Sequence, residues 1–208
     1  AKKATSVICV SENLKRELKT INKEKIHVIP RGINLEEFKV IDKNEARKEI
    51  GWSLEKRIIL FSQVREGAKV KNYPLALEAI NKLKEQVTEQ VQLIKMVDLT
   101  PRQVLLTLNA ADALIVTSIH EGSPNIIKEA MACNLPIVSV PCGDVPQRLK
   151  EVKTSAVCKY NAHDLSECLF NILKEKARSN GRESLINQRI DQDSTTQKIL
   201  EVYKGSVR

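Results

Sequence analysis

The 208-residue chain is long enough for one good-sized domain, and with 42% hydrophobic but only 3% aromatic residues its core must consist of aliphatic side chains. Its net charge of +8 suits a phosphate-bearing ligand first and an anionic membrane surface second. The sequence has neither the aromatic pattern of an RNA-binding domain nor a convincing helix-turn-helix pair, so we expect no nucleic-acid partner. No apolar run approaches the roughly 18 residues of a membrane-spanning helix.

Apolar runs that predict strands alternate with helical patterns along almost the whole chain. The predicted strands are 6–10, 26–29, 58–61, 91–97, 113–117, 135–140 and, weakly, 156–159. The predicted helices are one from residue 12 and others at 43–50, 72–89, 101–109, 124–133, 145–149, 162–178 and 194–203. Continuous apolar strands that alternate with helices indicate a parallel sheet covered on both faces, which is a doubly wound, Rossmann-like α/β fold.

Residues at the element boundaries predict where several helices begin and end. Ser11 is the predicted N-cap of the first helix, and Asn72 is that of the long helix that follows it in the chain. Gly51 is expected to stop the helix at 43–50.

Five cysteines without CxxC spacing predict buried free thiols in a reducing cytosol rather than a disulfide framework or a metal site. We therefore expect a cytoplasmic location.

The stretch from His120 to Gly143 combines a polar loop, a helix of about eleven residues and a buried strand. Ser123 is predicted to cap the helix, and Pro124 suits its first turn because a missing N–H costs nothing there. Asn134 is expected to end the helix in a left-handed conformation. A loop that runs into the N-terminus of such a helix is a ready site for an anion such as phosphate.

The loops 62–71, 98–100 and 118–123 each follow a predicted strand, so they should open on one edge of the sheet, where ligands of this fold bind. Arg65, Lys71 and the helix N-terminus would then converge, and two cations with a helix dipole suit a diphosphate. Glu121 and Glu129 flank this site, and the carboxylate of Glu129 suits ribose hydroxyls as a bidentate acceptor. The residues alone predict a binding site and no reaction.

The segment EGSPNIIKEAMACNLPIVSVPCGDVPQ, which begins at Glu121, closely resembles the donor-binding segment of the retaining glycosyltransferases of family 4, which have the GT-B fold. Glu121 and Glu129 have the spacing of the two glutamates in that family's motif. Other segments resemble the family in the same order: VICVSENLKREL, IHVIPRGINLEEF, FSQVREGAKVKNYPLALEAI and NAADALIVTS. The likeness is colinear and extends from about Ser6 to Leu149.

The resemblance implies roles for residues of a nucleotide-sugar site. Arg65 and Lys71 would bind the diphosphate, with Lys69 as the replacement if Arg65 is misassigned. Glu129 would hold the ribose, and Glu121 would lie by the donor sugar as the catalytic residue. Backbone groups near 97–99 would recognise the base. The cations and the helix dipole would stabilise the leaving diphosphate, so no metal or other cofactor is expected. The loop that meets the sugar and phosphate would consist of Gly122, Ser123, Pro124 and Asn125.

The resemblance also implies that the chain is the C-terminal half of a larger enzyme. Residues 1–35 would be the trailing strand and helix of the acceptor domain plus the interdomain loop, 36–180 the donor-binding domain, and 181–208 a C-terminal helix that packs back. The expected reaction is transfer of a hexose-type sugar from a nucleoside-diphosphate sugar to an acceptor, with retention. Without the missing N-terminal acceptor domain the chain is expected to be inactive. A membrane surface or a lipid-linked acceptor is a further expected partner, which would place the protein at the inner membrane surface.

Two alternatives remain open. A nucleotide-sugar epimerase shares the GT-B fold, but such enzymes lack this EGSPN…EAMA setting. A non-catalytic scaffold domain is disfavoured by the joint presence of Lys71, Glu121 and Glu129. Two departures from the family pattern, Arg31 for Asn and Gln147 for Glu, leave the contacts of those positions undetermined.

Overall fold

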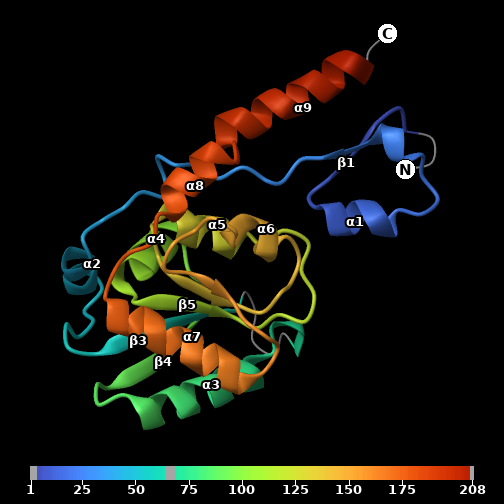
Figure 1. Cartoon of the computed structure of the whole chain (residues 1–208). Coiled ribbons are helices and arrows are strands. Elements are labelled where there is room, and N and C mark those ends of the chain that lie inside the picture. The colour runs from blue at the N-terminus through green and yellow to red at the C-terminus, as the bar shows by residue number, and fades with distance from the viewer. Residues whose placement is uncertain (1–3, 64–68, 207–208) are drawn as a thin grey trace.

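The computed structural model describes residues 4–63 and 69–206 of the chain (Figure 1). Its main element is a five-stranded sheet with strand order β4-β3-β5-β6-β7, in which every neighbouring pair is parallel. This confirms the predicted doubly wound, Rossmann-like fold. The strands are β3 (Arg57–Ser62), β4 (Val91–Met96), β5 (Ala113–Val116), β6 (Ile137–Ser139) and β7 (Ala156–Val157).

Helices cover both faces of this sheet. On one face α3 packs against α7, and α5 and α6 lie on the opposite face (Figure 1). The central strands are apolar on both sides, and Ile58–Phe61 of β3 are at most 1% exposed, as a sheet covered twice requires. The helices of this part are α2 (Lys43–Glu49), α3 (Tyr73–Gln86), α4 (Pro101–Ala110), α5 (Asn125–Ala132), α6 (Val145–Leu149), α7 (Ala162–Glu175) and α8 (Gly181–Asn187).

Three of the predicted boundary residues act as expected. The Ser11 side chain accepts a hydrogen bond from the backbone N–H of Leu14 and caps α1 (Glu12–Glu17). Gly51, after α2, has φ of 72°, and Asn134, after α5, has φ of 53°. Both therefore take the left-handed conformation that ends a helix.

One predicted cap, Ser123, is wrong, and Asn72 occupies its predicted N-cap position without a side-chain capping hydrogen bond. α5 begins at Asn125 with Pro124 in the N-cap position, and the Ser123 hydroxyl donates instead to Asp144. Asn72 precedes α3 but has φ of 52°, and its side-chain amide donates to the hydroxyl of Tyr160 at 2.8 Å. In both cases a partner distant in the sequence takes the side chain away from the helix end. α5 is also shorter than predicted, at 8 residues, and α8 was not predicted.

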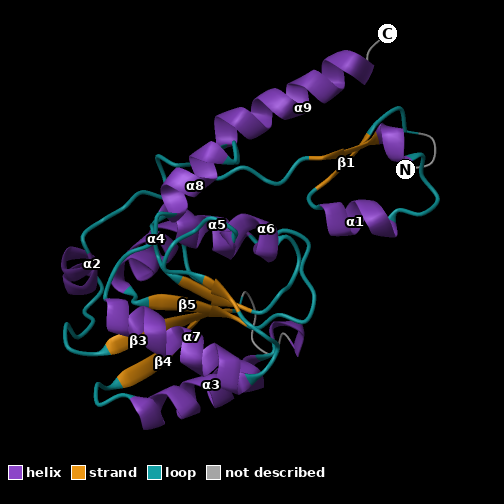
Figure 2. Ribbon diagram, in the orientation of Figure 1, coloured by secondary structure: helices purple, strands orange, loops and turns teal. Residues whose placement is uncertain are grey.

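The strands β1 (Val7–Cys9) and β2 (Ile26–Val28) form a separate two-stranded parallel sheet. Together with α1 and the 3₁₀ turn η1 (Lys23–Lys25) they make a small N-terminal unit with its own buried cluster of Cys9, Ile21 and Ile26. The helix α9 (Gln192–Ser206) extends from the main domain toward this unit (Figure 2). The assignment of residues 1–35 to an acceptor domain, 36–180 to a donor-binding domain and 181–208 to a C-terminal helix stays a prediction.

Residues 29–34, here called the linker, connect the N-terminal unit to the main domain. Ile33 pairs with the turn between α8 and α9, because its N–H donates to Ile190 O at 3.0 Å and its carbonyl accepts from Gln192 N at 2.9 Å. Of the helices in the described ranges, none combines the length and apolar character needed to cross a membrane.

Candidate functional site

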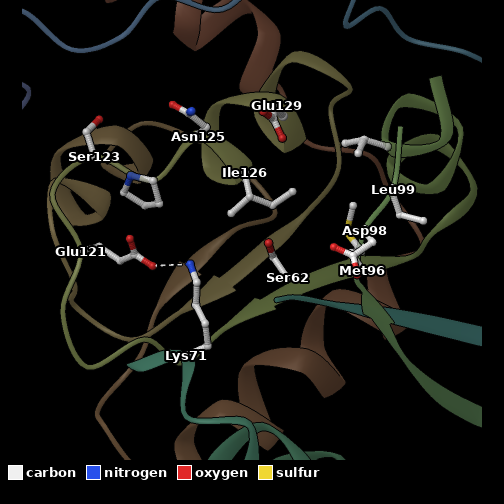
Figure 3. Close-up of a pocket in the computed structure, with 12 residues that line it drawn as sticks. Ser62, Lys71, Met96, Asp98, Leu99, Glu121, Ser123, Asn125, Ile126 and Glu129 are labelled. Carbon is white, nitrogen blue, oxygen red and sulfur yellow. Dashed lines mark hydrogen bonds and ion pairs between the residues drawn. The ribbon is translucent and has the colours of Figure 1, made fainter. Parts of the chain in front are cut away.

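A cavity of about 590 Å³ opens at the carboxyl edge of the five-stranded sheet. Ser62 and Met96, the last residues of β3 and β4, line it. Figure 3 shows Lys71 and Glu121 together on one side of the cavity and Asp98 and Leu99 on the other. The remaining lining residues are Val104, Ser123, Pro124, Asn125, Ile126 and Glu129. The predicted convergence of the loops at this edge is confirmed for the described residues.

Lys71 and Glu121 form an ion pair across the cavity wall. Lys71 Nζ lies 2.5 Å from Glu121 Oε1, and each side chain is 17% exposed. Lys71 ends the 3₁₀ turn η2 (Lys69–Lys71), whose Val70 carbonyl accepts from the Ile119 N–H at 2.9 Å. The loops after β3 and β5 are therefore joined directly, and a cation and a carboxylate are fixed side by side.

Thr117, at the end of β5, holds the backbone that carries Lys71. Its fully buried hydroxyl lies 2.9 Å from Lys71 O and 3.0 Å from Asn72 O, and donates to these carbonyls. Tyr160 completes the arrangement, since its hydroxyl accepts from the Asn72 amide and donates to Thr117 O at 3.1 Å. The position of the Lys71 ammonium thus depends on side chains from two other loops.

Glu129 projects from α5 and is partly buried. Burial raises the pKa of Glu129 above its ordinary value, and the positive charges of Lys128 and Arg31 oppose part of that rise. Asn125 and Ile126 lie one turn earlier at the start of the same helix. The cavity therefore combines a helix N-terminus with an acceptor of hydrogen bonds set deeper along the helix.

Gly143, in the loop after β6, packs against the backbone that carries Glu121. It has φ of 55°, and a Cβ at this position would lie 2.8 Å from Gly122 O and 3.0 Å from Glu121 O. Only glycine avoids both the backbone strain and this clash. The Gly143 carbonyl also accepts from Asn13 Nδ2 at 2.8 Å, which links α1 of the N-terminal unit to the site.

Asp98 and Leu99 lie in the region where base recognition was predicted. Asp98 has φ of 50°, a left-handed conformation that turns the chain sharply after β4. The two residues line the cavity at the end remote from Lys71 and Glu121 (Figure 3).

Arg65 belongs to 64–68, outside the described residues, so its contact with a diphosphate stays a prediction. Lys69, its predicted replacement, is exposed on η2, and the described residues that line the cavity do not include it. Within 4–63 and 69–206 no group of three or more His, Cys, Asp or Glu side chains could hold a metal ion. Burial raises the pKa of Cys133 to about 12 and that of Cys142 to about 11, so neither supplies a reactive thiolate near neutral pH.

The sequence reasoning missed four residues that support the site: Thr117, Lys128, Asp144 and Tyr160. Lys128 carried a usable signal, because it is the one basic residue of α5 and is flanked by the apolar residues Ile126, Ile127 and Ala130. The other three act through partners far away in the sequence, and no local pattern identifies such partners.

Two family models match the chain. The model described as "Glycosyl transferases group 1" matches residues 67–175, which is more than half of the 208 residues. The model described as "Glycosyltransferase Family 4" matches residues 1–37, the N-terminal unit and the linker.

The chain also resembles individual proteins of known sequence or structure. It is 26% identical over 182 residues to a Bacillus subtilis protein named "Putative teichuronic acid biosynthesis glycosyltransferase TuaC", over 80% of this chain and 46% of that protein. The sucrose-phosphate synthase of Thermosynechococcus elongatus superposes with a TM-score of 0.80 at 17% identity, over 98% of this chain and 59% of that one. Anabaena HepE, solved in complex with UDP and glucose, superposes with a TM-score of 0.76 at 16% identity, over 97% of this chain and 64% of that one. The likeness to the two solved structures establishes the fold, and the chain spans less than two thirds of each of these proteins.

Proposed function

The chain belongs to the group 1 glycosyl transferases, and from that membership we propose that its cavity binds a nucleoside-diphosphate sugar for transfer to an acceptor. One observation carries the proposal. Lys71, Glu121 and Glu129 line a single cavity, together with the N-terminus of α5. A cation, a helix dipole and two carboxylates match the charged diphosphate and the hydroxyl groups of such a ligand.

In this proposal the diphosphate lies beside Lys71 and the N-terminus of α5. The Lys71 ammonium donates to phosphate oxygens, and the free N–H groups of the first helical turn favour the same negative charge. Arg65 would add a second cation, with Lys69 as its replacement. The backbone of Gly122–Asn125 would meet the phosphate and the sugar, although Pro124 has no N–H to donate.

Glu129 is proposed to accept hydrogen bonds from the two ribose hydroxyls. In this proposal the ribose lies between the diphosphate and the end of the cavity at Asp98 and Leu99, where the base would lie, and the position of Glu129 along α5 supports this order. The base would contact backbone groups near 97–99. The complex of HepE with UDP and glucose supports a nucleotide in a fold of this kind.

The proposed reaction breaks the bond between the anomeric carbon and the diphosphate oxygen, which leaves with the bonding electrons, and forms a bond from that carbon to an acceptor hydroxyl oxygen, whose proton passes to the leaving diphosphate. The leaving diphosphate is stabilised by Lys71 and the helix N-terminus rather than by a metal ion. Glu121 lies beside the donor sugar, where a carboxylate stabilises positive charge that develops at the anomeric carbon. We propose retention and a hexose-type sugar from the resemblance to family 4.

The proposal is tested by calorimetric titration of the intact protein with UDP-, GDP- and ADP-glucose. Binding of one donor, weakened by substitution of Glu129, is expected. If no nucleotide sugar binds, the proposed function is wrong. Product analysis without acceptor separates transfer from epimerisation, because an epimerase would convert the donor sugar alone.

A further inference from the structure

Lys128 is a fully buried lysine, 1% exposed, directly beside Glu129 on α5. A buried ammonium group is costly unless hydrogen-bond acceptors surround it, so its partners show what keeps it there. Lys128 Nζ donates to Arg31 O at 2.9 Å and lies 3.4 Å from Ser123 Oγ. One of these partners belongs to the linker and the other to the loop that precedes α5.

The linker is held at consecutive residues. Arg31 is bound by Lys128, and Ile33 pairs with the turn between α8 and α9. Between them, Gly32 packs so closely that a Cβ would lie 2.8 Å from Gln192 Cα. The linker therefore has a fixed path, and Lys128 binds it at Arg31, before its contacts with the turn between α8 and α9.

The other partner of Lys128 belongs to the cavity wall. Ser123 lines the cavity, and its hydroxyl donates to Asp144 Oδ2 at 2.8 Å. The same carboxylate oxygen accepts from Arg148 Nε at 2.9 Å. The Ser123 hydroxyl is thus positioned by two contacts, one with the ammonium of Lys128 and one with the carboxylate of Asp144.

We propose that Lys128 is a positioning residue of the nucleotide-sugar site, which joins the linker at Arg31 to the ligand-facing loop at Ser123. The inference rests on the proposed function and adds a residue to it. Lys128 acts through its two partners and is not one of the described residues that line the cavity. Without its ammonium the loop 122–125 loses its fixed geometry, and a small displacement of groups that face a ligand is enough to weaken binding.

The charges around Lys128 supply a way to distinguish positioning from simple stabilisation. Burial lowers the pKa of Lys128 to about 8; Asp144 and Glu129 oppose this shift, and Arg148 and Arg31 add to it. The unfolded chain holds the proton up to the ordinary pKa of 10.5, so this group's contribution to folding stability rises with pH between these values. The contacts that need the ammonium are lost over the same range. Stability and ligand binding should therefore respond to its deprotonation in opposite directions.

The test compares Lys128→Met with Lys174→Met, an exposed lysine of α7, in the intact protein. UDP-, GDP- and ADP-glucose are titrated by calorimetry at about pH 7 and about pH 9.5, and melting temperatures are measured alongside. For the donor that the wild type binds, we expect Lys128→Met to raise the dissociation constant roughly tenfold at the lower pH without lowering the melting temperature. The difference in dissociation constant between Lys128→Met and the wild type should be smaller at the higher pH. The control Lys174→Met should have the dissociation constant of the wild type at both pH values.

Each other outcome overturns a defined part of the proposal. If the wild type binds a donor and Lys128→Met binds it equally at the lower pH, the inference is wrong and the proposed function stands. If the wild type binds no donor, both are wrong. If the ratio of the two dissociation constants is the same at both pH values and the variant also has a lower melting temperature, Lys128 has only a structural role. If Lys128→Met does not fold, the donor affinity of the wild type is measured as a function of pH. An affinity that does not change through pH 8 contradicts the inference.

Discussion

At the scale of single residues, the position of Glu129 makes a specific claim about the ligand. Its carboxylate is partly buried and lines the cavity beyond the α5 N-terminus. Because two buried hydrogen bonds to ribose would be lost, we expect Glu129→Ala to weaken donor binding by about 1–3 kcal/mol. Calorimetry measures this, with exposed Glu151→Ala as the matched control. Unchanged affinity in Glu129→Ala would remove the ribose assignment.

The pH dependence of binding follows from the same residue. Burial raises the pKa of Glu129 above 4.5, so its proton is taken up at a higher pH than that of an exposed glutamate. The native state then holds more protons than the unfolded chain in the window above 4.5, and this group's contribution to stability falls as the pH rises through it. Donor affinity should change in the other direction and fall on acidification, as the carboxylate loses acceptor capacity. This pH dependence of donor affinity should be absent in Glu129→Gln, measured by calorimetry over the same pH range.

Among the residues that the structure describes, Lys71 is the basic side chain that lines the cavity, and it forms an ion pair with Glu121. We expect Lys71→Met to weaken binding of the nucleoside diphosphate more than binding of the free nucleoside, because the lost interaction is with phosphate. Exposed Lys84→Met on α3 removes the same charge at a distance and is the control. Equal loss for nucleoside and diphosphate would place the phosphates elsewhere.

The residues of the cavity wall were largely predictable, and those behind it were not. Lys71, Glu121 and Glu129 were identified from loop positions and from the motif spacing. Ser123 was read as a helix cap because its local setting fits one, but its hydroxyl bonds to Asp144, 21 residues away. A short-range pattern gives no information on a partner at that separation, and tertiary contacts decide such cases.

At the scale of elements, the loops around β5 and β6 determine the shape of the site. Gly143→Ala should therefore both destabilise the fold and weaken donor binding, because its Cβ would displace the Glu121–Gly122 backbone. Gly51→Ala is the matched control, with a similar positive φ of 72° and no heavy atom of the described residues within 4 Å of the added Cβ. It should cost about 1 kcal/mol of stability and leave binding unchanged.

Chemical denaturation and calorimetry on both variants check this prediction. If Gly143→Ala loses stability only to the extent of Gly51→Ala and binds donor normally, the loop after β6 does not hold the site.

The elements themselves were well predicted because parallel strands buried on both faces are continuous apolar runs. β3, β4 and β5 and the start of α4 agree closely with expectation. α8 was missed, since it is short and packs through Gly181, where a Cβ would lie 2.7 Å from Met131 Cα. That close contact with α5 is a property of the folded chain and leaves no periodicity in the sequence.

At the scale of the whole molecule, the two sheets of the described residues differ in size. The five-stranded sheet has a large core, whereas β1 and β2 form a sheet of only two strands, which is marginal on its own. That the N-terminal unit belongs to an acceptor domain stays a prediction. We expect the isolated 208 residues to transfer no sugar to any acceptor, and measurable transfer in an assay with labelled donor would contradict this.

The central claim is that the cavity bounded by Lys71, Glu121 and Glu129 holds a nucleoside-diphosphate sugar. The most direct measurement is calorimetric titration of the intact protein and its Glu129→Ala variant with UDP-, GDP- and ADP-glucose. We predict that the wild type binds one of these donors and that the variant binds it at least several-fold more weakly, in line with the loss of about 1–3 kcal/mol. Equal binding by both proteins, or no binding of any donor by the wild type, would contradict the claim.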